Sequence, residues 1–206
     1  MNTNNNLNLN LLSDYTLRLA ISEDAYEIWT VMDISSKSIE QKEHFICDDL
    51  DYVKDILSGH GFGVVACDMN GKIVGNLLVK YPGLDKENLG YDVFVKSSEN
   101  SADNRFPHSN QSTEYSIFLT SENLKRVVHM DSASVHPEHR GHHLESRMIA
   151  FAETVIDTTK YIYLFATVAP GNRASLKSLE RNGYQVMVTK EKYCGVMRCV
   201  MMKKLT

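Results

Sequence analysis

The chain has 206 residues, of which 43% are hydrophobic and 23% are charged, and its formal net charge is −4. This size and composition are typical of one globular domain, or of one domain with a sizeable insertion. The small acidic excess argues against non-specific binding of nucleic acid, which depends on surplus Lys and Arg. No apolar run reaches the length of about 18 residues that a membrane-spanning helix needs, so no membrane partner is expected.

Residues 1–14 form an Asn-rich tail that we predict to be disordered. The tail lacks a basic stretch followed by an apolar block, so we expect no secretory signal. The four cysteines show no CxxC spacing. Together these features predict free thiols and a cytoplasmic location.

In the first half of the chain, the spacing of apolar residues indicates alternating strands and helices. It predicts a strand at 16–20, a helix at 23–33 capped by Ser22, a helix at 48–58, and strands at 62–67 and 72–81 joined by an Asn70-Gly71 hairpin turn. The polar stretch 96–112 has no periodicity and predicts a flexible loop within an insertion of about 84–122.

The second half of the chain returns to regular patterns. It predicts an extended run at 126–137 ended by Pro137, a helix at 142–156, a strand at 161–168, a helix at 172–182, and strands at 184–190 and 194–204. Strands and helices in this order indicate an α/β fold with a mixed sheet covered by helices.

Four histidines, His136, His139, His142 and His143, precede the 142–156 helix. Their spacing matches no zinc motif and no cysteine lies nearby, so we predict no metal site. They are either exposed polar residues around a loop, or, for His142 and His143, direct contacts to a phosphate.

The same segment has the features of an anion site. A strand ending at Val135 is followed by Arg140-Gly141 and then by a helix. The first turn of a helix offers unpaired N–H groups and the positive end of the helix dipole. Glycine permits close approach of a phosphate, and arginine adds charge-assisted hydrogen bonds.

Segment 131–156 resembles the acetyl-CoA motif of the GNAT superfamily of N-acetyltransferases, V-x-P followed by R-x-x-G-x-G/A and a helix. Segment 166–186, ATVAPGNRASLKSLERNGYQV, resembles the following strand and helix of the same family. The resemblance covers residues 15–206 and implies a single GNAT acyl-CoA N-acyltransferase domain with a twisted mixed sheet of about seven strands flanked by about four helices. It implies that acetyl-CoA is bound by Ser134, Val135, Arg140, Gly141, His142, His143, Leu144, Glu145, Ser146, Asn172 and Ser175.

The first motif departs from the family pattern at two positions. His143 stands where the first motif glycine belongs, and Glu145 stands where the second Gly or Ala belongs. A side chain at 143 narrows the phosphate site. The negative charge of Glu145 weakens binding of phosphates unless the side chain points away.

Family members transfer the acetyl group directly to an amine and use a general base. Alternation along the strand places His129, Asp131, Ala133 and Val135 on one face. His129 and Asp131 occupy positions where members carry the base, so either is a candidate, directly or with Asp131 orienting His129; the alternative is a substrate-binding or purely structural role. Glu114 is a weaker third candidate. The resemblance implies that the Val135 N–H stabilises the developing oxyanion.

The sequence leaves alternatives for a cofactor contact, for the general acid and for one arginine. Asn172 is a helix N-cap, a cofactor contact, or both. The family's usual acid, a Tyr, is replaced by Leu179, which leaves Tyr184 and Tyr193 as alternatives in sequence only. Arg198 lies in a stretch that resembles Y-G-G-x-x-R and points either to the substrate or, as the commoner outcome for a strand arginine, to solvent.

These features predict an acetyl-CoA-dependent N-acetyltransferase acting on a primary amine of a small metabolite or a protein, as a monomer or homodimer. The alternative from another class is a GNAT-fold CoA-binding sensor or scaffold with little or no activity. A metal-dependent hydrolase is a third and weaker alternative.

Overall fold

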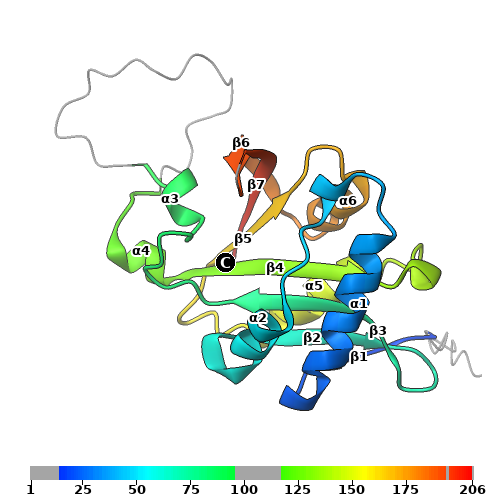
Figure 1. Cartoon of the computed structure of the whole chain (residues 1–206). Helices are drawn as coiled ribbons and strands as arrows, with labels where there is room; N and C mark the ends of the chain where they lie inside the picture. The colour runs from blue at the N-terminus through cyan, green and yellow to red at the C-terminus, as the bar shows by residue number, and fades with distance from the viewer. Residues whose placement is uncertain (1–13, 96–116, 194, 206) are drawn as a thin grey trace, which may run out of the picture.

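The computed structural model describes residues 14–95, 117–193 and 195–205. Most of the predicted tail, the polar 96–112 loop and Glu114 lie outside these residues. The described chain forms one seven-stranded sheet in the order β1-β2-β3-β4-β5-β7-β6 (Figure 1). Only the β4–β5 pair is parallel. This arrangement confirms the predicted mixed sheet.

The strands lie close to their predicted positions. They are β1 Thr16–Leu19, β2 Gly61–Cys67, β3 Ile73–Lys80, β4 Val127–Val135, β5 Tyr163–Val168, β6 Gln185–Lys192 and β7 Val196–Lys204. The helices are α1 Ala25–Lys37, α2 Leu50–Asp55, α3 Gly90–Val93, α4 Ser121–Lys125, α5 Leu144–Val155 and α6 Arg173–Arg181. None of the described helices is long and apolar enough to cross a membrane.

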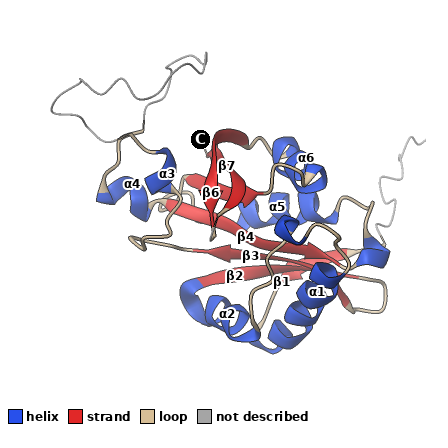
Figure 2. Cartoon of the chain, turned by 45° about the horizontal axis from the view of Figure 1, so that its top comes forward, coloured by secondary structure: helices blue, strands red, loops and turns tan. Residues whose placement is uncertain are grey.

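Helices cover both faces of the sheet (Figure 2). Helices α1 and α2 pack on one face over a cluster that includes Ile28, Met32 and Leu78. Helix α5 packs on the other face, where Met148 and Leu77 belong to the largest cluster. Burial of these apolar faces is the main force that fixes the helices on the sheet.

Two local predictions differ from the structure. Ser22 does not cap α1 but is the first residue of a 3-10 turn, Ser22–Asp24. The Asp24 carboxylate holds this turn, because it accepts hydrogen bonds from the Ile21 N–H at 2.8 Å and from Arg18. The predicted flexible insertion 84–122 contains the short helix α3 and the start of α4, and an isolated bridge joins Val95 to Phe118.

Strand β4 carries a β-bulge in its middle. Leu77 of β3 pairs with Ala133 of β4, but Val79 pairs with Met130, so β4 has one more residue than β3 over this stretch. The side chain of Asn76 fills the irregular space. Its Nδ2 donates to the Ser132 carbonyl at 3.0 Å, and its Oδ1 accepts from the Ser134 hydroxyl.

The bulge corrects one prediction about β4. Ala133 and Val135 do not share a face with His129 and Asp131; they pack with Met130 against the α5 cluster. The extra residue reverses the alternation of side chains along the strand. The polar side chains of β4 therefore gather on the face that α1 and α2 cover.

Strands β4 and β5 separate after a short contact. They pair only at Val127–Tyr163, Val128–Leu164 and His129–Phe165, and beyond these residues β5 leaves β4 at an angle (Figure 1). At the end of β4, the His136 N–H donates to Val74 of β3 at 2.8 Å. Because successive amides along a strand point to opposite edges, the Val135 N–H is directed to the open β5 side.

We predict that Asn76→Ala lowers the free energy of unfolding by about 2 kcal/mol, because Asn76 is fully buried and its loss leaves the Ser132 carbonyl without a partner. Urea denaturation measures this change. Asn70→Ala in the exposed hairpin turn is the matched control, with an expected change of at most about 0.5 kcal/mol. Equal effects at both positions would contradict the role of Asn76 in the bulge.

Candidate functional site

A cavity of about 730 Å³ occupies the opening between β4 and β5. Its walls come from β4 residues Met130–Val135, from Ala166, Thr167 and Val168 of β5, and from the first turns of α5 and α6. Backbone groups on the open edge of β4 face this space. The cavity can therefore accept an extended ligand that pairs with β4 as a short additional strand.

The connection between α1 and α2 forms the cover of the cavity. His44, Phe45, Ile46 and Asp48 from this segment line the space. The segment reaches the loop before α6, where the Asn172 amide donates to the His44 carbonyl at 3.4 Å. A Cβ at Gly171 would come within 2.7 Å of the His44 ring, so a larger residue there would displace this ring.

Two carboxylates lie side by side against the β4 bulge. Asp131 accepts a hydrogen bond from the Tyr52 hydroxyl of α2, and Asp48 accepts one from the Ser132 hydroxyl. Burial raises the pKa of Asp131 to about 6, and the nearby charge of Asp48 adds to this rise. Asp131 is therefore a carboxylate that changes protonation close to neutral pH and can accept a proton there.

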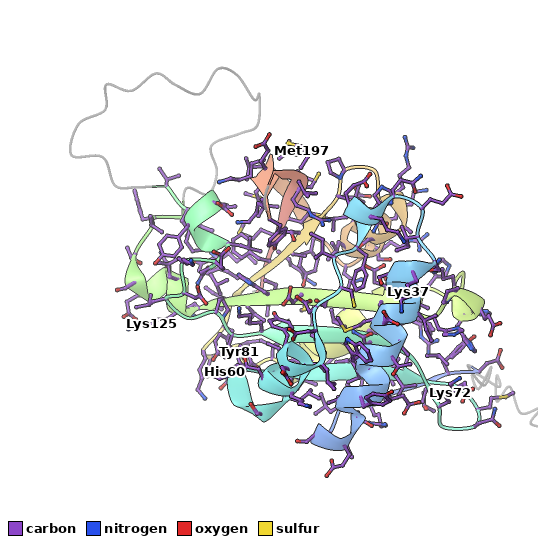
Figure 3. The ribbon with its side chains drawn as sticks, viewed as in Figure 1. Lys37, His60, Lys72, Tyr81, Lys125 and Met197 are labelled. Atoms are coloured by element: carbon purple, nitrogen blue, oxygen red, sulfur yellow. The ribbon has the colours of Figure 1, made fainter. Side chains whose placement is uncertain are left out.

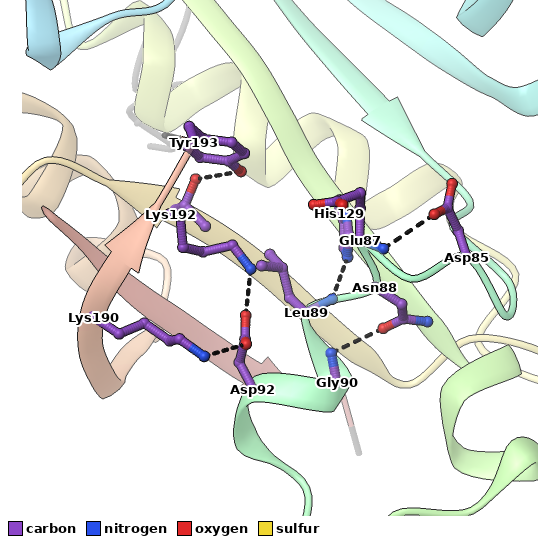
Figure 4. Close-up of polar contacts among 11 residues, drawn as sticks. Asp85, Glu87, Asn88, Leu89, Gly90, Asp92, His129, Lys190, Lys192 and Tyr193 are labelled. Atoms are coloured by element: carbon purple, nitrogen blue, oxygen red, sulfur yellow. Dashed lines mark hydrogen bonds and ion pairs between the residues drawn. The ribbon is translucent and has the colours of Figure 1, made fainter. Parts of the chain in front are cut away.

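His129 has a different environment from Asp131. Its Nε2 accepts a hydrogen bond from the Leu89 N–H at 3.0 Å (Figure 4), so the ring nitrogen that could act as a base is already occupied. Burial and the charge of Lys80 lower the pKa of His129 to about 3. This geometry favours His129 as a support for the chain around Leu89, and it favours Asp131 as the base.

The segment 88–92, whose Leu89 N–H contacts His129, is also joined to β6. Asp92 of α3 forms ion pairs with Lys190 at 2.7 Å and with Lys192 at 2.5 Å (Figure 4). Asn88 is buried, and its amide donates to the Gly83 and Leu124 carbonyls. The described part of the predicted insertion is therefore an anchored wall next to the cavity.

The loop before α5 contains two residues in a backbone conformation that favours glycine. Gly141 has φ of 88° and His143 has φ of 56°, both in the left-handed region. His143 is the N-cap residue of α5 and makes no side-chain cap, while its Nδ1 lies 2.8 Å from Arg181 of α6. The histidine thus adopts a backbone conformation that favours glycine, at a cost of about 1 kcal/mol.

Arg140 and Glu145 both bond to neighbouring helices. Arg140 donates to the hydroxyls of Ser38 at 2.7 Å and Ser35 at 3.2 Å, both on or just after α1. Glu145 accepts from the Ser175 hydroxyl at 2.5 Å, and burial raises its pKa. A raised pKa favours the neutral form of Glu145, which reduces the repulsion of phosphate that the sequence predicts.

His139 and His142 contact Tyr15, which precedes β1, and the His136 and His139 rings contact each other. The Tyr15 hydroxyl lies 3.0 Å from His139 Nδ1, and the Tyr15 ring lies 5.1 Å from the His142 ring. Ligand atoms of His136, Glu138 and His139 lie within 4.8 Å of one another and could hold a metal ion at the surface. The absence of a metal from the functional site stays a prediction.

The structure brings most of the predicted site residues together. The cavity is lined by His129 and Asp131, and by Ser134, Val135, Arg140, Gly141, His143, Leu144, Glu145, Asn172 and Ser175. His142 and Ser146 are not among the lining residues; Ser146 accepts from the Asn182 amide instead. Asn172 caps α6, because its side chain accepts from the Ser175 N–H at 3.2 Å.

Sequence reasoning missed several residues of the cavity. Tyr52, Asp48 and Lys80 line it, and the Lys80 ammonium lies 5.8 Å from the centre of the Tyr52 ring. Of the two tyrosines suggested as acids, Tyr193 lines the cavity, whereas Tyr184 is buried outside it. Tyr52 is 79 residues from Asp131, and no motif links them in the sequence.

Comparisons with known proteins agree on the fold. No family model and no curated protein matches the chain by sequence. Solved structures that match include an N-acetyltransferase from Staphylococcus aureus Mu50, with 14% identity, a TM-score of 0.61, and coverage of 94% of this chain and 100% of that chain. A second is a GNAT superfamily phosphinothricin acetyltransferase from Sinorhizobium meliloti in complex with acetyl-CoA, with 14% identity, a TM-score of 0.60 and coverage of 93% and 89%.

A third match is a ribosomal-protein-S5-alanine acetyltransferase from Vibrio fischeri, with 16% identity, a TM-score of 0.57 and coverage of 93% of both chains. The described chain therefore has the GNAT acetyltransferase fold. The acceptors that these proteins are named for differ, so the fold alone does not specify the acceptor of this chain.

We predict that His143→Gly is more stable than His143→Ala by about 1 kcal/mol, because both variants lose the Arg181 contact and only glycine relieves the left-handed backbone. Thermal or urea unfolding measures the difference. At Lys177, an exposed position in the middle of α6, the order should be reversed, with alanine more stable than glycine. The same order at both positions would contradict the strain at His143.

Proposed function

We propose that this protein, which has the GNAT fold, is an acetyl-CoA-dependent N-acetyltransferase that acetylates a primary amine without a covalent enzyme intermediate. The observation that carries the proposal is the juxtaposition of three features in one cavity. These are the open edge of β4 with the Val135 N–H, the titratable Asp131, and the helix start at α5. Direct acyl transfer requires an oxyanion donor, a base and a site for the donor's phosphates.

The residues of the cavity fit an acyl-CoA. The extended arm of the cofactor would lie along the unpaired edge of β4, next to Ser134 and Val135. Its phosphates would meet the first-turn N–H groups of α5, beside His143, and the glycine at 141, which has open space around its Cα. Arg140 lines the same space and offers a guanidinium. When bound, acetyl-CoA supplies an acetyl group activated as a thioester.

The chain's own groups account for the transfer. Asp131 in its ionised form takes a proton from the acceptor nitrogen, which then forms a bond to the acetyl carbon. The Val135 N–H donates a hydrogen bond to the carbonyl oxygen as negative charge develops there. The carbon–sulfur bond breaks, and the sulfur leaves as a thiolate that takes up one proton. Tyr193 lines the cavity as a hydroxyl donor for that proton.

We predict that acetyl-CoA binds and that Arg140→Ala weakens binding about tenfold or more, because the variant removes a charge-assisted hydrogen bond to phosphate. Isothermal titration calorimetry measures this. Arg126→Ala is the control, since Arg126 does not line the cavity, and it should bind as the parent does. Absence of binding to the parent protein at millimolar acetyl-CoA would contradict the proposed function.

We predict that kcat/KM falls about tenfold per pH unit below pH 6, because Asp131 must be ionised to act as the base and its pKa is about 6. Tyr52→Phe should move this acid limb to higher pH, since the Tyr52 hydrogen bond lowers the pKa of Asp131. Asp131→Asn should reduce kcat at least about 100-fold and leave acetyl-CoA binding unchanged.

A pH–rate profile with the amine acceptor in excess tests these outcomes. His129→Asn is the comparison variant, because it removes the second candidate base. An acid limb that disappears in His129→Asn and persists in Asp131→Asn would assign the base to His129. Tight binding of acetyl-CoA without acetylation of any amine in a broad panel would favour the non-catalytic sensor.

A further inference from the structure

Arg198 is a buried cation without an ion-pair partner among the described residues, and Glu43 is the one carboxylate whose charge acts on it from a greater distance. The residue is 4% exposed, whereas Met197 beside it is 44% exposed and lies on the surface (Figure 3). Its Nε has no hydrogen-bond partner, and none of the described carboxylates lies within ion-pair distance of its guanidinium. Of the two orientations that the sequence leaves open, Arg198 adopts the one that faces the interior.

Two other poorly exposed cations of the described chain, Lys192 and Lys203, are paired. The Lys192 side chain is 12% exposed and lies 2.5 Å from Asp92, and the Lys203 side chain is 25% exposed and lies 2.5 Å from Glu153. A charge buried without a partner destabilises the folded state. An unpaired guanidinium at a concave site is therefore a candidate for recognition of an anion that arrives with a ligand.

Arg198 lies in the proposed catalytic cavity. It lines the same space as Asp131. Tyr193 lies near both residues, since the charges of Asp131 and Arg198 both act on its hydroxyl group. The Arg198 guanidinium carbon lies 5.7 Å from the centre of the Tyr193 ring, and the Tyr193 hydroxyl lies 3.2 Å from Thr167 Oγ1.

The backbone of Tyr193 supports this placement. Its φ is 49°, a left-handed conformation that is unfavourable for tyrosine, in the turn between β6 and β7. This conformation turns the ring towards Arg198 and Thr167. The contact shields one side of the guanidinium and leaves its hydrogen-bonding groups without a protein acceptor among the described residues.

The two carboxylates at the β4 bulge and the Arg198 guanidinium line the cavity from different strands and loops. Asp131 and Asp48 lie against the β4 bulge, and Lys80 near them is balanced by their charges. Arg198 lies on β7, on the other side of the β4–β5 opening in the sheet order. A ligand that spans the opening would meet carboxylates at one end and a guanidinium at the other.

We infer that the acetyl acceptor carries a carboxylate in addition to its primary amine, and that Arg198 binds this carboxylate while the amine lies at Asp131. The inference rests on the proposed function and narrows its substrate class to amino-acid-like acceptors. A guanidinium presents parallel N–H donors that match the two oxygens of a carboxylate. An acceptor of this kind supplies the partner that Arg198 lacks.

The test uses the 20 common amino acids, each with its carboxamide, as acceptors for acetyl-CoA. The best amino acid should exceed its amide in kcat/KM by about 30-fold or more, since loss of one partner of a buried charge pair has an effect of this size. Arg198→Met should remove that preference and leave acetyl-CoA binding unchanged. Arg198→Lys should retain part of it, because lysine keeps the charge and loses the paired donors.

Stability gives a second readout that a structural role would not produce. Arg198→Met should raise the melting temperature, because it removes an unpaired buried charge. Lys192→Met is the matched control and should lower it, because it leaves the carboxylate of Asp92 without its 2.5 Å partner. A fall in melting temperature for Arg198→Met would indicate a structural guanidinium and overturn the inference.

Other outcomes separate this inference from the proposed function. Equal use of acids and amides by the parent protein, or a preference that survives Arg198→Met, would overturn the inference and leave acetyl transfer intact. Weaker acetyl-CoA binding in Arg198→Met would assign Arg198 to the donor's site instead. If no amine is acetylated, the proposed function fails, and calorimetry with the same acids and amides in the presence of CoA still tests carboxylate binding at Arg198.

Discussion

The site depends on the β-bulge in β4 and on the Asn76 side chain that holds it. Because of the extra residue, Asp131 faces α2 while Val135 packs towards α5 and directs its N–H to the open edge. A regular strand would place all these side chains in simple alternation and would continue to pair with β5. The bulge thus separates the polar chemistry of β4 from its apolar packing, and the cost of the irregular backbone is offset by the two hydrogen bonds of Asn76.

The electrostatics of the cavity follow from this geometry. A carboxylate moved out of water becomes a stronger base, and the pKa of Asp131 rises to about 6 for this reason. The Tyr52 hydrogen bond limits the rise, so the group is mostly ionised at neutral pH and still basic. His129 has the usual pKa for such a role in water, but burial and its hydrogen bond from Leu89 make it a poor proton acceptor here. Position in the fold, and not residue type, decides which of the two can act as the base.

Much of the fold was predictable from the sequence, because local patterns determine it. The Asn70-Gly71 turn and the apolar spacing of α5 and α6 specify elements within a few residues of their observed bounds. The left-handed conformation at 143 was not predicted, because the sequence carries a histidine at a position whose backbone favours glycine. The Tyr52–Asp131 contact and the interior orientation of Arg198 were not predictable. Each depends on pairing or packing between segments far apart in the chain, and side-chain alternation assumed the wrong register for the end of β4.

In the proposed complex, the open edge of β4 binds an acyl-CoA as an additional strand. Hydrogen–deuterium exchange of residues 130–147, with and without acetyl-CoA, distinguishes an occupied edge from an empty one. We expect slower exchange at Val135 and at the first turn of α5 when acetyl-CoA is present, because these N–H groups would then be hydrogen-bonded by the ligand. Unchanged exchange at both places under saturating acetyl-CoA would exclude this binding mode, since the edge of β4 would then remain open to water and the cavity would serve another ligand.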